Sequence, residues 1–119
     1  MRVLDLEEGL SIFKDAYSDV VKSAYVDDYN GESASIVITF YEDANLKSLN
    51  PTIKRFFRYF IGEIVFPNEF GSREDNMYMF DSYYLYKEAN YEYLDALKSG
   101  NEMSFIKQKR KEDANKKRG

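Results

Sequence analysis

The sequence predicts an α+β fold, in which an N-terminal helix, a β-hairpin and an amphipathic helix precede a helical C-terminal segment with a basic tail. Two stretches with apolar residues at steps of three and four predict the helices, and an Asn-Gly pair beside a β-prone run predicts the hairpin. A chain of 119 residues has the length of one domain. We expect a single compact domain over residues 1–106, followed by a basic, flexible or helical tail over residues 107–119.

The first helix is predicted to begin at Asp5, which has the spacing of a capping box with Glu8. Each of these side chains can accept a hydrogen bond from a free backbone N–H in the first turn. The helix is expected to end near residues 22–24, where its apolar periodicity stops. Its apolar face comprises Leu6, Leu10, Phe13, Tyr17, Val20, Val21 and Ala24.

The hairpin is predicted at Asn30 and Gly31, because both residues tolerate the positive φ angles of a type I′ turn. Residues 33–42 are rich in β-branched and aromatic side chains, and residues 24–29 can pair back onto them. Two adjacent aspartates lie in this first arm, which is therefore expected to be an edge strand.

Asn50 followed by Pro51 predicts the start of a second helix, because a capping residue before a proline is favoured at that position. An apolar face follows, and a loop over residues 67–72 is expected to end the helix. The opposite face is basic and is expected to face water. The apolar face comprises Ile53, Phe56, Phe57, Phe60, Ile61, Ile64 and Val65, and the basic face comprises Lys54, Arg55 and Arg58.

Residues 77–98 fit two interpretations, because the first part can alternate like a strand whereas the residues from 81 onward also line one helical face. We expect a short strand over residues 77–80 and a helix from residue 81 or 82 to residue 98. Gly100 suits the left-handed position past a helix end. A last helix from residue 101 is expected to fray within the basic tail.

The composition favours binding over catalysis. The chain has eleven tyrosines and nine phenylalanines but no histidine, cysteine or tryptophan. It therefore lacks the residue types used most often for acid–base catalysis, thiol chemistry and zinc binding, and no glycine-rich loop could hold a phosphate. We expect a protein that is not an enzyme and needs no cofactor. The lack of cysteine, of a signal peptide and of a long apolar run favours the cytoplasm.

Charge divides the chain into an acidic body and a basic tail, although the net charge is only −4. Residues 1–50 hold ten acidic and four basic residues, whereas residues 107–118 hold seven basic and two acidic ones. Acidic charge of this kind commonly serves solubility, but it could also present carboxylates to a basic groove on a partner. The spacing of Asp27, Asp28 and Glu32 is not that of an EF-hand, so we expect no metal there.

The predicted function is a small non-enzymatic protein-binding module that occupies a surface of a macromolecular partner. Size, acidic body and aromatic content match the profile of phage or mobile-element proteins that inhibit host nucleic-acid-handling enzymes, including defence systems. Most aromatic residues are explained as core, but two tyrosines seven residues apart on one predicted helix flank suit an interface. The predicted partner-binding residues are Tyr84, Tyr91, Asp27, Asp28 and Glu32, with Tyr25, Tyr29 and Tyr59 as further candidates.

Two other functions stay open at this point. A nucleic-acid-binding or regulatory protein would use the basic tail together with the basic face of the second helix, although both can equally be solvated surface. Self-association through the tyrosine flank would make the chain a homo-oligomer. The predicted nucleic-acid-binding residues are Lys54, Arg55, Arg58, Lys107, Lys109, Arg110 and Lys111.

Overall fold

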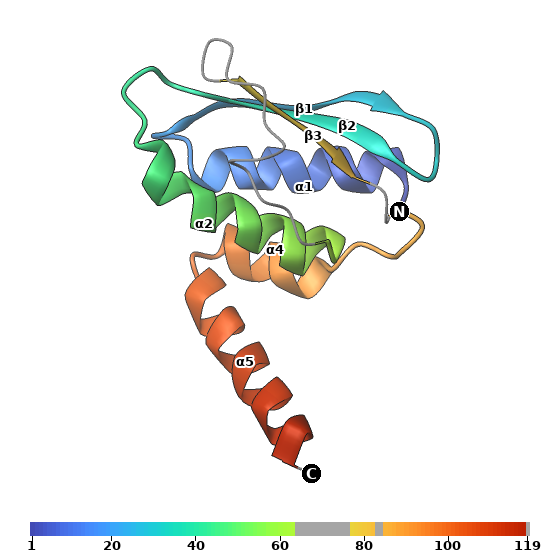
Figure 1. Cartoon of the computed structure of the whole chain (residues 1–119), viewed down its shortest axis with the longest axis vertical. Helices are drawn as coiled ribbons and strands as arrows, with labels where there is room; N and C mark the ends of the chain where they lie inside the picture. The colour runs from blue at the N-terminus through green and yellow to red at the C-terminus, as the bar shows by residue number, and fades with distance from the viewer. Residues whose placement is uncertain (64–76, 83–84, 119) are drawn as a thin grey trace.

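The computed structural model describes residues 1–63, 77–82 and 85–118, which form an α+β fold, as predicted. A three-stranded antiparallel sheet lies over helices, and the last helix extends away from this body (Figure 1). In chain order the elements are α1 (Val3–Ala16), β1 (Val21–Tyr29), β2 (Ala34–Phe40), α2 (Leu46–Phe56), the π-helix η1 (Phe57–Ile61), β3 (Met77–Ser82), α4 (Tyr91–Lys98) and α5 (Glu102–Arg118).

The sheet has the strand order β1-β2-β3, so β1 lies at an edge, as predicted. Side chains alternate between the two faces of a strand. On the inner face, Ile36 and Ile38 of β2 are buried beside Tyr78 and Phe80 of β3. These residues belong to the same core cluster as the apolar residues of α1 and α2, so both helices cover this inner face.

Aromatic rings fill the core between the sheet and the helices. The ring centroids of Phe13 in α1 and Phe56 in α2 are 4.7 Å apart, and those of Phe57 in η1 and Phe80 in β3 are 5.1 Å apart. Tilted aromatic pairs of this kind contribute about 0.5–1.5 kcal/mol beyond the area that they bury. Within the described residues, the predicted apolar face of the second helix is therefore confirmed.

The start of the first helix differs from the prediction, because Asp5 is not its cap. α1 begins at Val3, and the flanking Arg2 forms no side-chain capping hydrogen bond. The Arg2 side chain instead donates to both carboxylate oxygens of Asp5, at 2.9 Å and 3.0 Å. Asp5 and Glu8 therefore both lie inside α1, and their spacing does not mark its start.

The end of the first helix was predicted too late. α1 ends at Ala16 rather than near residues 22–24, and residues 17–20 form a turn. Val21 pairs with Phe40 in the sheet, where a β-branched side chain packs well on the pleated surface. Val20, Val21 and Ala24 therefore have the spacing of a helix face, although Val20 lies in the turn and the other two lie in β1.

The predicted hairpin is confirmed, but its turn is longer than the two-residue type I′ turn that the sequence suggested. β1 and β2 are joined by the four residues 30–33. The Asn30 Oδ1 atom accepts hydrogen bonds from the backbone N–H groups of Glu32, at 3.0 Å, and Ser33, at 2.8 Å. This side-chain acceptor stabilises the longer turn. Gly31 has a φ angle of 93°, which glycine adopts without steric cost.

The second helix begins at Leu46, so Pro51 lies inside it instead of at its first position. Leu49 and Ile53 are both buried and lie four residues apart, so burial extends the helix upstream of the proline. The helix continues into η1 and ends at Gly62, whose φ angle is 83°. Residues 64 and 65 of the predicted apolar face and the predicted loop over 67–72 lie outside the described residues.

The predicted helix from residue 81 or 82 to residue 98 is mostly wrong in its first half. β3 extends to Ser82, and residues 85–90 form turns and irregular structure. α4 begins only at Tyr91, where the Asn90 side chain accepts a hydrogen bond from the Tyr93 backbone at 3.1 Å. Pairing with β2 competes successfully with helix formation here, since the strand buries alternate side chains in the core. Residues 83 and 84 lie outside the described residues.

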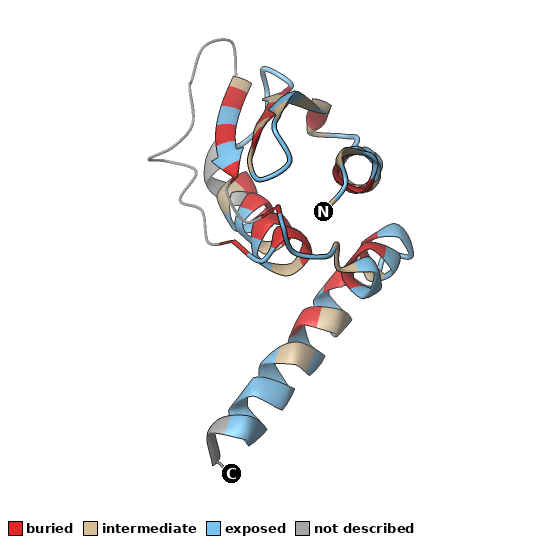
Figure 2. Ribbon diagram, turned by 90° about the vertical axis from the view of Figure 1, so that its right-hand side faces the viewer, coloured by how far each residue is buried: buried red, intermediate tan, exposed pale blue. Residues whose placement is uncertain are grey.

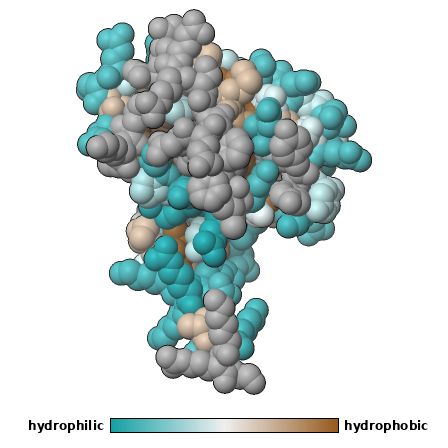
Figure 3. Space-filling model, in the orientation of Figure 1, coloured by the Kyte–Doolittle hydropathy of each residue, from teal (hydrophilic) through white to brown (hydrophobic). Residues whose placement is uncertain are grey.

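α5 runs through the basic tail to Arg118 and projects from the body. Gly100 before it has a φ angle of 80°, as expected for the residue past a helix end. Figure 2 shows that, over residues 102–116 of α5, burial is confined to the first half, where Glu102 and Ile106 are buried. The projecting part is mostly hydrophilic on the side that Figure 3 shows.

Candidate functional site

The face of the sheet opposite the core carries side chains in rows across the three strands. One row consists of Tyr25 on β1, Val37 on β2 and Met79 on β3, which are register partners. Tyr25 is 46% exposed and Met79 is 36% exposed, while Val37 between them is 1% exposed. The row therefore forms an apolar patch with an aromatic ring and a thioether at its surface.

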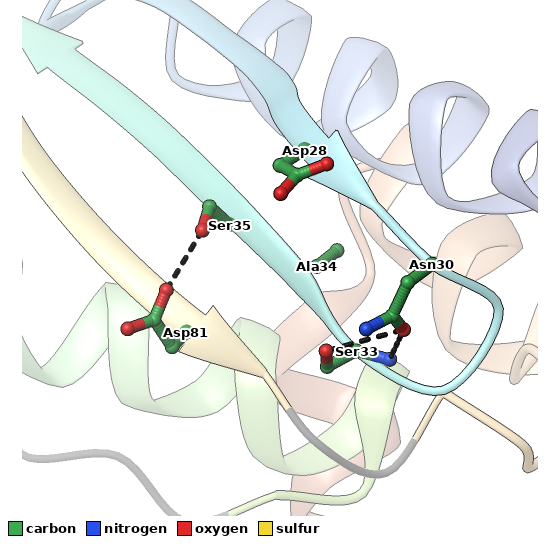
Figure 4. A pocket seen from close by; sticks show the side chains of 6 residues that line it. All are labelled: Asp28, Asn30, Ser33, Ala34, Ser35 and Asp81. Atoms are coloured by element: carbon green, nitrogen blue, oxygen red, sulfur yellow. Dashed lines mark hydrogen bonds between the residues drawn. The ribbon is translucent and has the colours of Figure 1, made fainter.

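The neighbouring row is acidic. It consists of Asp28, Ser35 and Asp81, and the Ser35 hydroxyl donates to Asp81 Oδ1 at 2.8 Å (Figure 4). These residues line a pocket of about 210 Å³ near the hairpin loop. Because β1 and β3 are two strand spacings apart, the backbones of the two aspartates are separated by about 10 Å. We call the two rows the outer sheet face: Tyr25, Val37, Met79, Asp28, Ser35 and Asp81.

Sequence reasoning missed most of this face. Val37, Met79 and Asp81 were not among the predicted site residues, although they occupy the positions that alternate with core residues in β2 and β3. That alternation was the available signal. It could not be used, because the third strand was ambiguous and strand register depends on residues far apart in the chain.

Three of the predicted carboxylates gather at the acidic end of the outer sheet face. Asp28 belongs to it, Asp27 lies at a register irregularity of β1, and Glu32 lies in the hairpin loop. All three are exposed. Among the described residues, no group of three or more potential metal-ligating side chains is arranged to hold a metal ion.

Tyr91 lies in a different pocket from this acidic end. It is the first residue of α4 and lines a pocket of about 500 Å³ with Asp5 and Tyr29. The Tyr91 hydroxyl donates to the Asp5 carboxylate, and this hydrogen bond raises the pKa of the Tyr91 phenol. Because α4 begins at Tyr91, the predicted helical flank shared with Tyr84 does not exist. Tyr84 itself lies outside the described residues.

A buried carboxylate joins three helices and the turn that follows α1. Glu102 of α5 accepts hydrogen bonds from the hydroxyls of Tyr17, after α1, and Tyr93 of α4. Arg55 of α2 forms an ion pair with it, with 3.5 Å between Nε and Oε1. Burial raises the pKa of Tyr17 to about 12 and that of Tyr93 well above its usual range, so both phenols remain hydrogen-bond donors at neutral pH. Arg55 is therefore held by the fold, whereas the sequence had placed it on a solvated face.

The two predicted basic features meet at a groove of about 250 Å³ between α2–η1 and α5. Arg58 and Arg110 both line it. Lys109 does not: its Nζ lies 3.7 Å from the Glu92 carboxylate and 3.6 Å from that of Glu112. The other predicted cations are Lys54 and Arg55, which also line the groove, and Lys107 and Lys111, which are exposed on α5.

No helix in the described part of the chain combines the length and apolar character that a bilayer span requires. Comparisons of the chain with protein-family models, curated proteins and solved structures find no match. What this chain binds is therefore inferred from its own surfaces.

Proposed function

We propose that this chain is a non-enzymatic protein-binding module that docks through its outer sheet face on a basic surface of a macromolecular partner. The observation that carries the proposal is the row in which the exposed Tyr25 and Met79 flank the buried Val37, beside a row with two carboxylates. Protein interfaces combine a well-packed centre, enriched in aromatic residues and methionine, with a polar rim. The outer sheet face has this composition.

The charge of this face indicates which partner fits it. Its two rows contain two carboxylates and no basic residue, and the exposed Asp27 and Glu32 add negative charge at the same end. A carboxylate rim attracts lysine and arginine and repels phosphate. The complementary surface is therefore basic, and such surfaces follow the phosphate backbone in proteins that handle nucleic acid.

A module that occupies such a surface excludes the nucleic acid and so inhibits its partner without chemistry of its own. We therefore assign the chain to small acidic proteins of phages or mobile elements that block a host nucleic-acid-handling enzyme or defence system. The absence of histidine and cysteine from the sequence supports binding over catalysis.

The test uses the heparin-binding fraction of a bacterial lysate, which is enriched in proteins with basic nucleic-acid-binding surfaces. A protein captured by the immobilised chain is purified, and its affinity is measured for the wild type, for Tyr25→Ala and for Asp28→Lys with Asp81→Lys. A central interface tyrosine contributes about 2 kcal/mol or more, so Tyr25→Ala should weaken binding by more than about tenfold. The wild type should also block nucleic-acid binding by the captured protein.

Glu7→Lys with Asp15→Lys is the matched control, because both carboxylates are exposed on α1 and the change in charge is the same. Its affinity should stay within about threefold of the wild type, or less than 1 kcal/mol. An equal loss in this control would mean that general electrostatics, and not the outer sheet face, causes binding. If the captured protein still binds nucleic acid at saturating concentrations of the chain, the inhibitor function is refuted.

A further inference from the structure

We infer that the groove between α2–η1 and α5 is a second binding site, which takes the phosphate backbone of a nucleic acid. It is formed by residues about fifty positions apart in the sequence, from the basic face of the second helix and from the basic tail. Its lining includes Lys54, Arg55, Arg58, Tyr59, Met103 and Arg110.

The exposed charge in this groove is positive. Lys54, Arg58 and Arg110 are exposed, and within the described residues Arg58 and Arg110 form no ion pair. The nearby carboxylate of Glu102 is already engaged by Arg55 and by two tyrosine hydroxyls. Three exposed cations around one groove favour a ligand with several negative charges, such as consecutive phosphates.

The geometry of α5 selects which tail residues reach the ligand. Met103, Lys107 and Arg110 follow one another at steps of four and three, so they lie on one side of the helix. Met103 and Arg110 line the groove, whereas Lys107 between them is exposed but does not belong to the lining. Lys109 lies on another side of α5, next to Glu92 of α4. The tail is therefore not a uniform basic segment.

The size of the groove and the packing of its wall favour contact with the backbone of a nucleic acid rather than with its bases. A volume of about 250 Å³ is below the roughly 300–1,000 Å³ of pockets for drug-sized ligands, so it admits one phosphate with its sugar at a time. The Tyr59 ring is packed against Tyr93 and Phe105, with centroids 6.0 Å and 6.1 Å away. That ring is part of the wall and not a platform for bases, so binding should not depend on base sequence.

The experiment measures binding of a fluorescein-labelled oligothymidylate by anisotropy at increasing salt concentration. Each neutralised phosphate of a single strand contributes about −0.7 to the slope of log K against log salt, so three cations predict a slope of about −2. Arg58→Ala with Arg110→Ala should reduce the slope to about −0.7 and weaken binding at low salt by about tenfold or more. Both side chains are exposed, and circular dichroism verifies that the variant is folded.

Lys98→Ala with Lys109→Ala is the matched control, since it removes the same charge from α4 and from the other side of α5. Its slope should remain near the wild-type value. The inference is overturned if the wild type does not bind, if the control loses as much slope as the groove variant, or if polyglutamate competes as well as unlabelled oligothymidylate.

This site is independent of the protein-docking function, because the groove and the outer sheet face share no residue. Asp28→Lys with Asp81→Lys should therefore retain the salt slope of the wild type for the oligothymidylate. The two functions can thus fail separately.

Discussion

Replacing Gly9 by alanine should destabilise the protein, even though alanine is the better helix former. Gly9 lies in the middle of α1, next to the ring of Phe60 in η1. A Cβ atom at Gly9 would lie 2.3 Å from Cε1 and Cζ of Phe60, whereas carbon atoms pack best at about 3.5–4.0 Å. The ring cannot easily move away, because it is 1% exposed and packs against Phe56 with 5.2 Å between centroids.

Two opposing effects set the size of the change. Alanine in place of glycine stabilises a helix interior by about 0.5–1 kcal/mol. Overpacking a core costs about 1–3 kcal/mol, and a confined aromatic ring places this position in the upper part of that range. The net loss in the free energy of unfolding should be about 1–2 kcal/mol, which lowers the Tm of a domain of this size by about 3–10 °C.

Urea unfolding followed by circular dichroism measures this loss. Ser11→Ala is the matched control, since Ser11 is exposed on the same helix and should gain only a few tenths of a kcal/mol from helix propensity. In Gly9→Ala with Phe60→Leu, the smaller side chain makes room, so the double variant should lose about 1 kcal/mol less than the sum of the single variants. A Gly9→Ala protein as stable as the wild type would refute the close approach of α1 to η1.

Two further predictions concern the buried and paired ionisable groups. Tyr17→Phe removes a donor to the Glu102 carboxylate and should lower the free energy of unfolding at neutral pH by about 1.5–3 kcal/mol. Because burial raises the pKa of Tyr17 from 10.0 to about 12, this contribution is present below pH 10 and is lost as the pH rises toward 12. Urea unfolding of both proteins should therefore show a difference that shrinks over this interval, and a constant difference would contradict the role of the phenol. Asp5→Asn should destabilise the fold at neutral pH, because hydrogen bonds from Arg2 and Tyr91 hold the pKa of Asp5 well below its ordinary value. That contribution is present above the ordinary carboxyl pKa and is lost as the pH falls below it. The free energies of unfolding of the two proteins should therefore converge in acid. Equal stability at neutral pH would show that the pairing has no effect on folding.

Apolar periodicity was sufficient to predict the residues that fill the core. Phe13, Phe56 and Phe60 are buried as their helical spacing requires, because residues three and four apart share one face of a helix. The hairpin was equally predictable from the sequence, since Asn30 and Gly31 are residues that favour a turn through local interactions.

The ends of several elements were not predictable from such patterns. Val21 continues the helical spacing of α1 but belongs to β1, and residues 81 and 82 fit a helix but extend β3. A short apolar run is compatible with either structure. The choice was made by pairing with β2, which lies elsewhere in the chain.

Local spacing and composition are sufficient to predict the α+β class, the edge position of the first strand, and the division into an acidic body and a basic tail. Which exposed residues share a surface depends instead on how distant segments pack together. Strand register joined Tyr25 to Met79, and the docking of α5 put Arg110 beside Arg58 while it put Lys109 near Glu92. Register and helix docking are set by burial between distant segments. Local sequence patterns do not specify which distant segments come into contact.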